Sequence, residues 1–324
     1  MPETLSLTRE EAAAVTDDII REVERAVIGK QELLFQIMTA VVAEGHILLE
    51  DYPGLAKTLI AKSFAAALGL QFKRIQFTPD LLPGDITGSI IFDRDKNDFR
   101  MEKGPIFANI AFADEINRAS PKTQAALLEA MQEGQVTLGG ETLSLPRPFV
   151  VIATQNPSEY EGTFPLPEAQ LDRFLIKTSV GYPTEEEEQR ILTRRRERKQ
   201  DQFQLKQVAS AEQLAEVGRL AEEVHVDSDI ERYIVSLVHR SRADRRTTVG
   251  ASPRGSLALL KLSRAYASLQ GRDFVLPDDV KRFVLPALSH RLILKPDLWM
   301  KKSAVSEVLN TVLTEVRVPV VEGE

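Results

Sequence analysis

Short apolar segments alternate with helical patterns over the first 183 residues, and this alternation constrains the fold more than any other feature. Residues 46–50 (HILLE), 109–113 (NIAFA) and 149–154 (FVVIAT) are apolar runs with polar boundaries, as expected of buried parallel strands. Helical spacing of apolar residues covers residues 30–44 and about 58–69. We therefore predict an α/β fold in which helices cover both faces of a mostly parallel sheet.

Two segments interrupt this alternation and predict hairpins. Residues 88–104 lie between two core elements and carry a charged tip, DRDKND. Residues 135–145 (QVTLGGETLSL) place Gly139 and Gly140 between two alternating segments, which predicts a two-residue turn. Such excursions from a sheet often carry binding function, although they can also be inert decorations.

The sequence changes character after residue 183. Helical spacing with little strand signal continues to about residue 314, in segments separated by Asp, Ser, Gly and Pro. We predict a domain boundary near residue 183 and an all-helical domain over residues 184–324.

Composition excludes several classes of protein. The 324-residue chain has no cysteine, which excludes disulfides, cysteine nucleophiles and thiolate metal sites. Its formal net charge of -7 argues against a dedicated nucleic-acid binder. No run approaches the roughly 18 apolar residues that span a bilayer. We expect a soluble, cytoplasmic protein.

A strand, a glycine-bearing loop and a helix follow one another at residues 46–58, the context of a phosphate-binding loop. The helix N-terminus would attract an anion, Lys57 could reach the terminal phosphates, and the Thr58 hydroxyl could bind magnesium. The usual pattern G-x-x-x-x-G-K-[ST] has Asp51 and Ala56 in place of its two glycines. An ordinary strand–turn–helix connection is therefore the alternative.

Polar side chains also follow the other two apolar strands. Asp114 and Glu115 would lie where parallel sheets bind ligands, Asp114 in a magnesium shell and Glu115 polarising an attacking water. The alternative is an acidic helix start. Asn156 could orient water or a phosphate oxygen, or form a turn. Arg173, alone, would be taken for a surface salt-bridge residue.

Taken in order, these elements resemble those of the AAA+ ATPases, and longer strings resemble the MoxR family within them. The strings are QFTPDLLPGDITG (76–88), GPIFANIAFADEINRASPKTQAALLEAMQEGQVT (104–137), ATQNPSEYEGTFPLPEAQLDRF (153–174) and GASPRG (250–255). The resemblance implies a P-loop AAA+ αβα nucleotide-binding domain with a parallel sheet over residues 1–183. It also implies a C-terminal all-helical lid domain over residues 184–324.

The resemblance implies that ATP and Mg²⁺ are the cofactors. Val27 to Lys30 would lie beside the adenine, and Gly54 to Thr58 would wrap the phosphates. Thr58 and Asp114 would hold the magnesium ion, Asp114 through water. The implied cofactor-binding residues are Val27, Ile28, Gly29, Pro53, Gly54, Leu55, Ala56, Lys57, Thr58, Leu59 and Asp114.

The resemblance also implies catalytic roles in the hydrolysis of ATP to ADP and phosphate. Asp114 and Glu115 would be the Walker B pair, and Asn156 the sensor 1 residue. Arg173 would be the arginine finger, inserted into a neighbouring subunit's site. Arg254 would be the sensor 2 arginine, acting in cis or in trans. Arg118 is a second candidate for a contact between subunits.

A ring, typically a hexamer, is implied because the arginine finger must come from a neighbour. The excursions at about 80–104 and 135–145 would be the helix-2 insert and the pre-sensor-1 hairpin, which usually face the central pore. Family members often work with a partner that carries a von Willebrand factor A domain, and some assist metal-cofactor insertion. We expect a motor that remodels or matures client proteins.

Three alternatives stay open: a nucleic-acid motor of the same clade, a chelatase-type motor subunit, and a nucleotide-gated scaffold with little hydrolysis. The basic clusters Arg194–Lys199 and Arg240–Arg246 fit a solvated or subunit-facing helix surface better than a nucleic-acid track. Asp51 and Ala56 keep the scaffold open. The histidines, which form no metal-binding motif and are expected in packing or at the surface, are His46, His225, His239 and His290.

Overall fold

The computed structural model describes residues 6–157, 162–301 and 303–319. Within them, five strands form the main sheet in the order β2-β5-β8-β1-β9, and all four neighbouring pairs are parallel. The predicted parallel sheet is therefore confirmed. The carboxyl ends of the adjoining strands β5, β8 and β1 share one edge, where open α/β sheets bind ligands. The strands are β1 (Ile47–Glu50), β2 (Phe72–Gln76), β5 (Ile110–Asp114), β8 (Val150–Gln155) and β9 (Ile176–Thr178).

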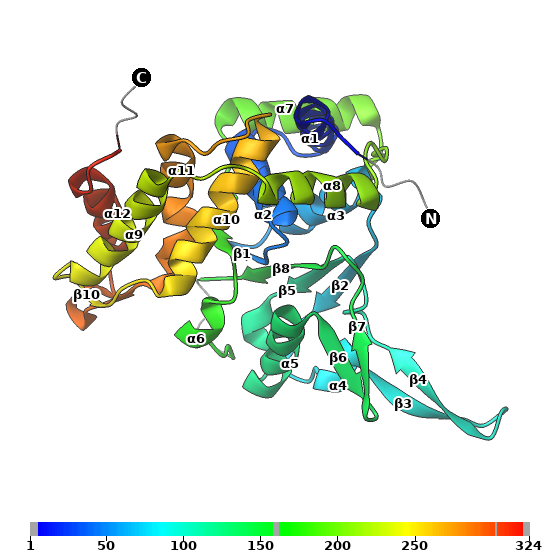
Figure 1. Ribbon diagram of the computed structural model, residues 1–324. Helices are drawn as coiled ribbons and strands as arrows, with labels where there is room; N and C mark the ends of the chain where they lie inside the picture. Colours follow the sequence, from blue (N-terminus) through cyan, green and yellow to red (C-terminus); the bar gives the residue numbers. More distant parts are fainter. Residues whose placement is uncertain (1–5, 158–161, 302, 320–324) are drawn as a thin grey trace.

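Helices cover both faces of this sheet, as Figure 1 shows. Ile47 and Leu49 belong to one buried cluster and Leu48, between them, to the other, because successive side chains of a strand point to opposite faces. A strand buried on both faces must be apolar throughout, which explains the continuous apolar runs. The first cluster includes α1 (Arg9–Glu24), α2 (Gln31–Val42) and α3 (Lys57–Ala67), and the second includes α4 (Pro83–Thr87) and α5 (Pro121–Glu133).

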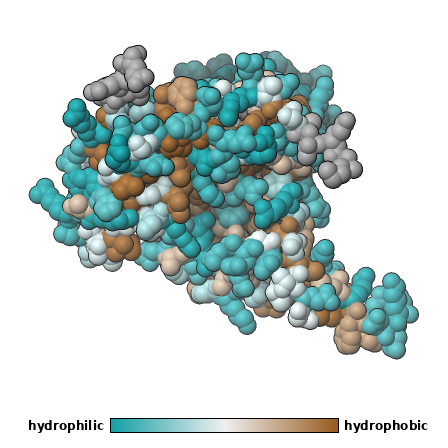
Figure 2. Space-filling view, in the orientation of Figure 1, coloured by the Kyte–Doolittle hydropathy of each residue, from teal (hydrophilic) through white to brown (hydrophobic). Residues whose placement is uncertain are grey.

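Both predicted hairpins are confirmed. Strand β3 (Gly88–Asp93) pairs antiparallel with β4 (Asp98–Lys103), and β6 (Gln135–Leu138) pairs antiparallel with β7 (Glu141–Ser144). The glycine pair between β6 and β7 has φ values of 58° and 88°, a left-handed turn that favours glycine. The β3–β4 hairpin extends beyond the body of the molecule (Figures 1 and 2).

The C-terminal region is helical, as predicted, with one addition. Strand β10 (Thr247–Val249) pairs antiparallel with β11 (Ile293–Leu294), so the region is not all-helical. Strands of two or three residues are too short to give an alternating pattern. Within the described residues, no helix is long and apolar enough to cross a bilayer. The helices are α7 (Glu185–Arg198), α8 (Ala211–Glu222), α9 (Ser228–Ala243), α10 (Pro253–Leu269), α11 (Pro277–Leu288) and α12 (Ala304–Glu315).

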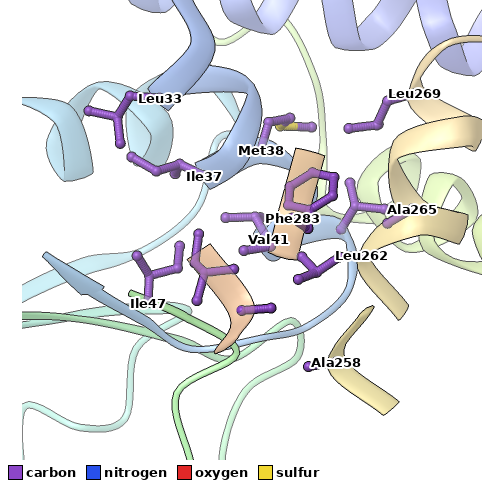
Figure 3. Packing of buried hydrophobic residues seen from close by; sticks show 14 of the residues in the cluster. Leu33, Ile37, Met38, Val41, Ile47, Ala258, Leu262, Ala265, Leu269 and Phe283 are labelled. Carbon is purple, nitrogen blue, oxygen red and sulfur yellow. The ribbon is translucent and has the colours of Figure 1, made fainter. Parts of the chain in front are cut away.

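The C-terminal helices share a hydrophobic core with the α/β layer. Met38 and Val41 of α2 pack in the same buried cluster as Leu262 and Ala265 of α10 and Phe283 of α11 (Figure 3). Helix α10 therefore packs against α2, which ends shortly before β1. The domain boundary near residue 183 stays a prediction.

His46, which directly precedes β1, is buried in its neutral form. Its Nε2 lies 2.9 Å from the carbonyl oxygen of Met131, and its Nδ1 accepts a hydrogen bond of 3.1 Å from the N–H of Val151. Burial lowers the pKa of His46 to about 4. The expected packing role of this histidine is confirmed.

Lowering the pH from 7 to 5 is expected to reduce the free energy of unfolding, and His46→Gln is expected to remove about 2 kcal/mol of that loss. The unfolded chain takes up a proton near pH 6.5, whereas folded His46 does so only near pH 4, so stability is lost as the pH falls through this window. Urea unfolding at both pH values measures the difference, with exposed His239→Gln as the control. An equal pH dependence in both variants would contradict the prediction.

Candidate functional site

The loop after β1 forms a cavity of about 340 Å³ with the carboxyl ends of β5 and β8. Strands β1, β5 and β8 are neighbours in the sheet, so polar residues distant in the sequence meet there. The residues predicted for catalysis or cofactor binding that line this cavity are Pro53, Gly54, Leu55, Ala56, Lys57, Thr58, Leu59, Asp114, Glu115 and Asn156.

The loop keeps its curvature without the usual glycines. Asp51 is buried, and its carboxylate accepts the N–H of Tyr52 at 2.9 Å and the N–H of Gly181 at 2.6 Å. The second bond links the start of the loop to the segment after β9. Ala56 adopts a φ of 54°, a left-handed conformation that costs a non-glycine residue about 1–3 kcal/mol and that recurs at functional sites.

Lys57 begins α3 and folds back over the loop. Its Nζ donates to the carbonyl oxygens of Asp51 at 2.5 Å and Tyr52 at 2.7 Å. The N-cap of α3 is Ala56, whose side chain cannot accept a hydrogen bond, so the first backbone N–H groups of α3 are suited to an anion.

Thr154 connects the two acidic residues of the cavity. Its Oγ1 donates to Asp114 Oδ1 at 2.7 Å and accepts the backbone N–H of Glu115 at 2.8 Å. Arg74 Nη2 lies 2.6 Å from the other carboxylate oxygen of Asp114. Glu115 itself has a φ of 57°, which is unusual for a residue with a side chain. The backbone at the end of β5 is therefore held in a specific, strained arrangement.

The Glu115 carboxylate contacts two further side chains. Its Oε2 accepts hydrogen bonds from Gln76 Nε2 at 3.1 Å and from Arg118 Nη1 at 2.9 Å. Arg118, which we predicted to contact another subunit, thus has a partner in its own chain. Arg74 and Gln76 were not predicted as site residues. They lie on the same face of β2, and the alternation in QFKRIQF (71–77) indicates a strand, but the pairing of β2 with β5 cannot be read from the sequence.

A second cavity, also of about 340 Å³, adjoins the first. Residues 54–56 of the loop line both cavities. Val27, Ile28 and Lys30, which we predicted to lie beside the adenine, line the second cavity. Gly29 does not line the cavity. Its φ of 68° is the left-handed conformation that favours glycine, and a Cβ atom there would meet the carboxylate of Glu187, the far end of a flexible side chain.

Part of the basic cluster 194–199 lies at this second cavity. Ile191, Arg194, Arg195 and Arg198 line it, at the spacing of one helix face. Arg194 donates to the carbonyl oxygen of Glu24 at 2.7 Å. The sequence favoured a solvated or subunit-facing helix surface for this cluster, and in the structure one face of the helix also borders the second cavity.

Arg173 and Arg254 lie at the opposite edge of the sheet. Both line a third cavity, of about 260 Å³, together with Gly45 and His46 at the amino end of β1. The loop of residues 51–56 follows the carboxyl end of β1. The strand, roughly 13 Å long, therefore separates this loop from the third cavity. The structure therefore does not bring Arg173 or Arg254 to the loop of their own chain.

Asp172 connects this edge of the sheet to the C-terminal helices. It follows the short helix α6 (Glu168–Leu171), and its Oδ1 accepts Arg291 Nε at 2.7 Å. Its Oδ2 accepts the hydroxyl of Ser252 at 3.2 Å and lies 3.7 Å from Arg254 Nη1. Arg173 donates to the carbonyl oxygen of Leu128 at 2.8 Å. The two predicted arginines thus share one face of the molecule.

The parallel sheet, the lysine-bearing loop after β1 and the acidic pair after β5 define a P-loop nucleotide-binding protein. Comparison with known proteins gives the same class. Residues 46–176 match the model of the ATPase family associated with various cellular activities (AAA), and residues 239–311 match the AAA lid domain.

Individual relatives indicate which family of AAA ATPases the chain belongs to. YeaC of Bacillus subtilis is 45% identical over 93% of this chain and 94% of its own length. The chaperone MoxR1 of Mycobacterium tuberculosis is 42% identical over 94% of this chain and 82% of its own length. A crystal structure of a Cytophaga hutchinsonii protein assigned as an ATPase superposes with a TM-score of 0.89 at 37% identity, covering 96% of this chain and 97% of that one. This chain belongs to the MoxR family of AAA+ ATPases.

Proposed function

We propose that the protein hydrolyses ATP in a Mg²⁺-dependent reaction and uses the energy as a ring-forming, chaperone-like motor. The observation that carries the ATPase proposal is the meeting of five side chains in one cavity at the carboxyl edge of the sheet. These side chains are Lys57, Thr58, Asp114, Glu115 and Asn156.

The residues of the two loop cavities suit ATP and magnesium. The Thr58 hydroxyl and the Asp114 carboxylate are hard oxygen donors of the kind that Mg²⁺ prefers, Asp114 acting through water. Bound magnesium would neutralise charge on the phosphates. Lys57 would leave the loop carbonyls for the terminal phosphates, and the apolar surface of Val27 and Ile28 would contact the adenine.

Glu115 is proposed to accept a proton from the attacking water. Its carboxylate would have to leave Gln76 and Arg118 to do so, so these two side chains would hold the resting position. Asn156, at the end of the neighbouring strand, would orient the water or a phosphate oxygen as the sensor 1 residue. Positioning of this kind is the main requirement of phosphoryl transfer.

We further infer that Arg173 and Arg254 act on the nucleotide of a neighbouring subunit. Their position at the amino edge of the sheet supports action in trans for both residues, including Arg254, whose mode of action the sequence left undecided. A surface at one edge that completes a site at the other edge is a heterologous interface, which forms a ring when the rotation between subunits closes. A hexamer is the proposed ring size.

The chaperone role rests on the relatives. MoxR1 of Mycobacterium tuberculosis is named a chaperone, and on that basis we propose that this protein remodels or matures client proteins. The proposed partner is a protein with a von Willebrand factor A domain, and metal-cofactor insertion is one proposed use. The β3–β4 and β6–β7 hairpins would face the pore of the ring.

Measurement of ATP hydrolysis against protein concentration tests the proposal. Turnover per subunit is expected to rise with concentration, and Lys57→Ala is expected to lower it at least about a hundredfold because a charge stabilising the transferred phosphate is lost. Lys62→Ala, an exposed lysine of the same helix, is the control and should keep wild-type turnover. ATP binding without turnover at any concentration would contradict the proposal and favour a scaffold.

A further inference from the structure

Basic side chains continue along α10 beyond Arg254. The cavity that holds Arg173 and Arg254 adjoins a fourth cavity, of about 460 Å³, with which it shares Ala43, Glu44 and Lys261. Lys261 and Arg264 follow Arg254 at the spacing of one helix face. The two cavities therefore form one continuous surface along α10, which we call the α10 surface.

The α10 surface is positively charged although the chain as a whole is negative. Seven basic side chains and three carboxylates line it, whereas the formal net charge of the chain is -7. Five of the seven basic side chains form ion pairs within the chain, one of them with Glu216 and Glu223 beside the surface. Lys261 is exposed and makes no ion pair within the described part of the chain. Arg147 lies 3.6 Å from Glu44, and both of these side chains are more than half exposed. Charge is thus available here for a second molecule.

A complementary acidic surface lies beside the nucleotide cavities. The first turn of α7 contains four consecutive glutamates, from Glu185 to Glu188, directly after the segment that lines the second cavity. Glu187 faces Lys30 of its own chain at 3.7 Å. Glu185 and Glu188 are exposed and form no ion pair among the described residues. This turn therefore presents unpaired negative charge close to the ATP site.

We infer that the α10 surface of one subunit binds the first turn of α7 in the neighbouring copy of the chain. The inference rests on the proposed function, in which Arg173 and Arg254 reach the neighbour's nucleotide. If these arginines reach the neighbour's nucleotide, the interface between the two subunits runs past both charged surfaces. Lys261 would then lie on one side of the interface, and the neighbour's Glu185 and Glu188 would lie on the other. Complementary charges at such a position fix the register of subunits and make assembly sensitive to salt.

A charge exchange in the full-length protein tests this contact. Lys261→Glu, and separately the double variant Glu185→Lys/Glu188→Lys, are expected to raise the concentration for half-maximal assembly about tenfold, because like charges would face each other. The triple variant that combines them is expected to return to within about threefold of the wild type. Sedimentation velocity with Mg²⁺ and ATP measures assembly, and thermal unfolding of each variant verifies its fold.

The control is Lys281→Glu, which makes the same charge change on α11, outside the α10 surface. Wild-type assembly of Lys261→Glu would overturn the inference. So would weakened assembly that the triple variant does not restore, because the acidic partner would then lie elsewhere. A wild-type protein that stays monomeric at every concentration would instead overturn the ring itself, and the test with Lys57→Ala would still report on the ATP site.

Discussion

Arg173→Ala is expected to lower the turnover of ATP at least about a thousandfold and to leave the affinity of an isolated subunit for ATP nearly unchanged. The loss follows from removal of the charge that stabilises the transferring phosphoryl group. Unchanged affinity follows from position, because Arg173 lines a cavity at the amino edge of the sheet, away from its own loop. Steady-state hydrolysis above the assembly concentration and binding of a fluorescent ATP analogue below it measure the two quantities.

Two further variants show whether position explains the effect. Arg254→Ala is expected to lose turnover in the same way, because Arg254 lines the same cavity. Arg232→Ala removes an exposed arginine of α9 whose ion-pair partner is Asp229, and it should behave as the wild type. If Arg173→Ala weakens ATP binding by a dilute, monomeric subunit more than about tenfold, then Arg173 serves its own site and the proposed action in trans is wrong.

Most of the sheet could be predicted from the sequence because its strands are buried on both faces. A run such as Ile110–Asp114, buried at every position, leaves little choice between strand and loop. The strand expected from the run RFLIKTSV (173–180) is shorter in the structure, where β9 spans only Ile176–Thr178. Before it, Arg173 donates to the carbonyl oxygen of Leu128 in α5, and the carbonyl oxygen of Phe174 accepts a hydrogen bond from Arg291.

Residues that line the nucleotide cavity could be predicted from the sequence when they lie at or near the end of a strand. Asp114 is the last residue of β5, Asn156 directly follows β8, and Lys57 follows the loop after β1. Parallel strands present these ends at one edge. Arg74 could not be predicted as a site residue, because its contact with Asp114 depends on which strand pairs with β5. Such a contact between residues 40 positions apart leaves no local pattern.

The departures from the phosphate-loop pattern have a structural explanation that the sequence alone did not provide. Asp51 replaces a flexible glycine with two hydrogen bonds to backbone N–H groups, one of them 130 residues away. Ala56 adopts the left-handed conformation that glycine would adopt more easily. Neither residue therefore argues for a scaffold that binds ATP without hydrolysing it, and turnover must decide.

Glu115→Gln is expected to lower turnover about a hundred- to ten-thousandfold, because the amide cannot accept a proton from water. ATP binding should persist, since Lys57 and the start of α3 are untouched. Hydrolysis at saturating ATP and equilibrium binding measure the two effects, and the exposed Glu129→Gln is the matched control. Turnover equal to that of Glu129→Gln would show that Glu115 is not the base, and it would support the scaffold if turnover were also barely detectable in both variants.

Mixing the Arg173→Ala and Glu115→Gln proteins tests the proposed action in trans directly, because Glu115 and Arg173 are proposed to meet only across an interface between subunits. A subunit with Arg173→Ala keeps its own Glu115, and a neighbour with Glu115→Gln still supplies Arg173. In a random ring from equal amounts, about one interface in four contains both intact residues, so activity should return to about a quarter of the wild-type value. If both residues served the same subunit's site, no mixture would contain a complete site, and hydrolysis would stay at the level of the separate variants.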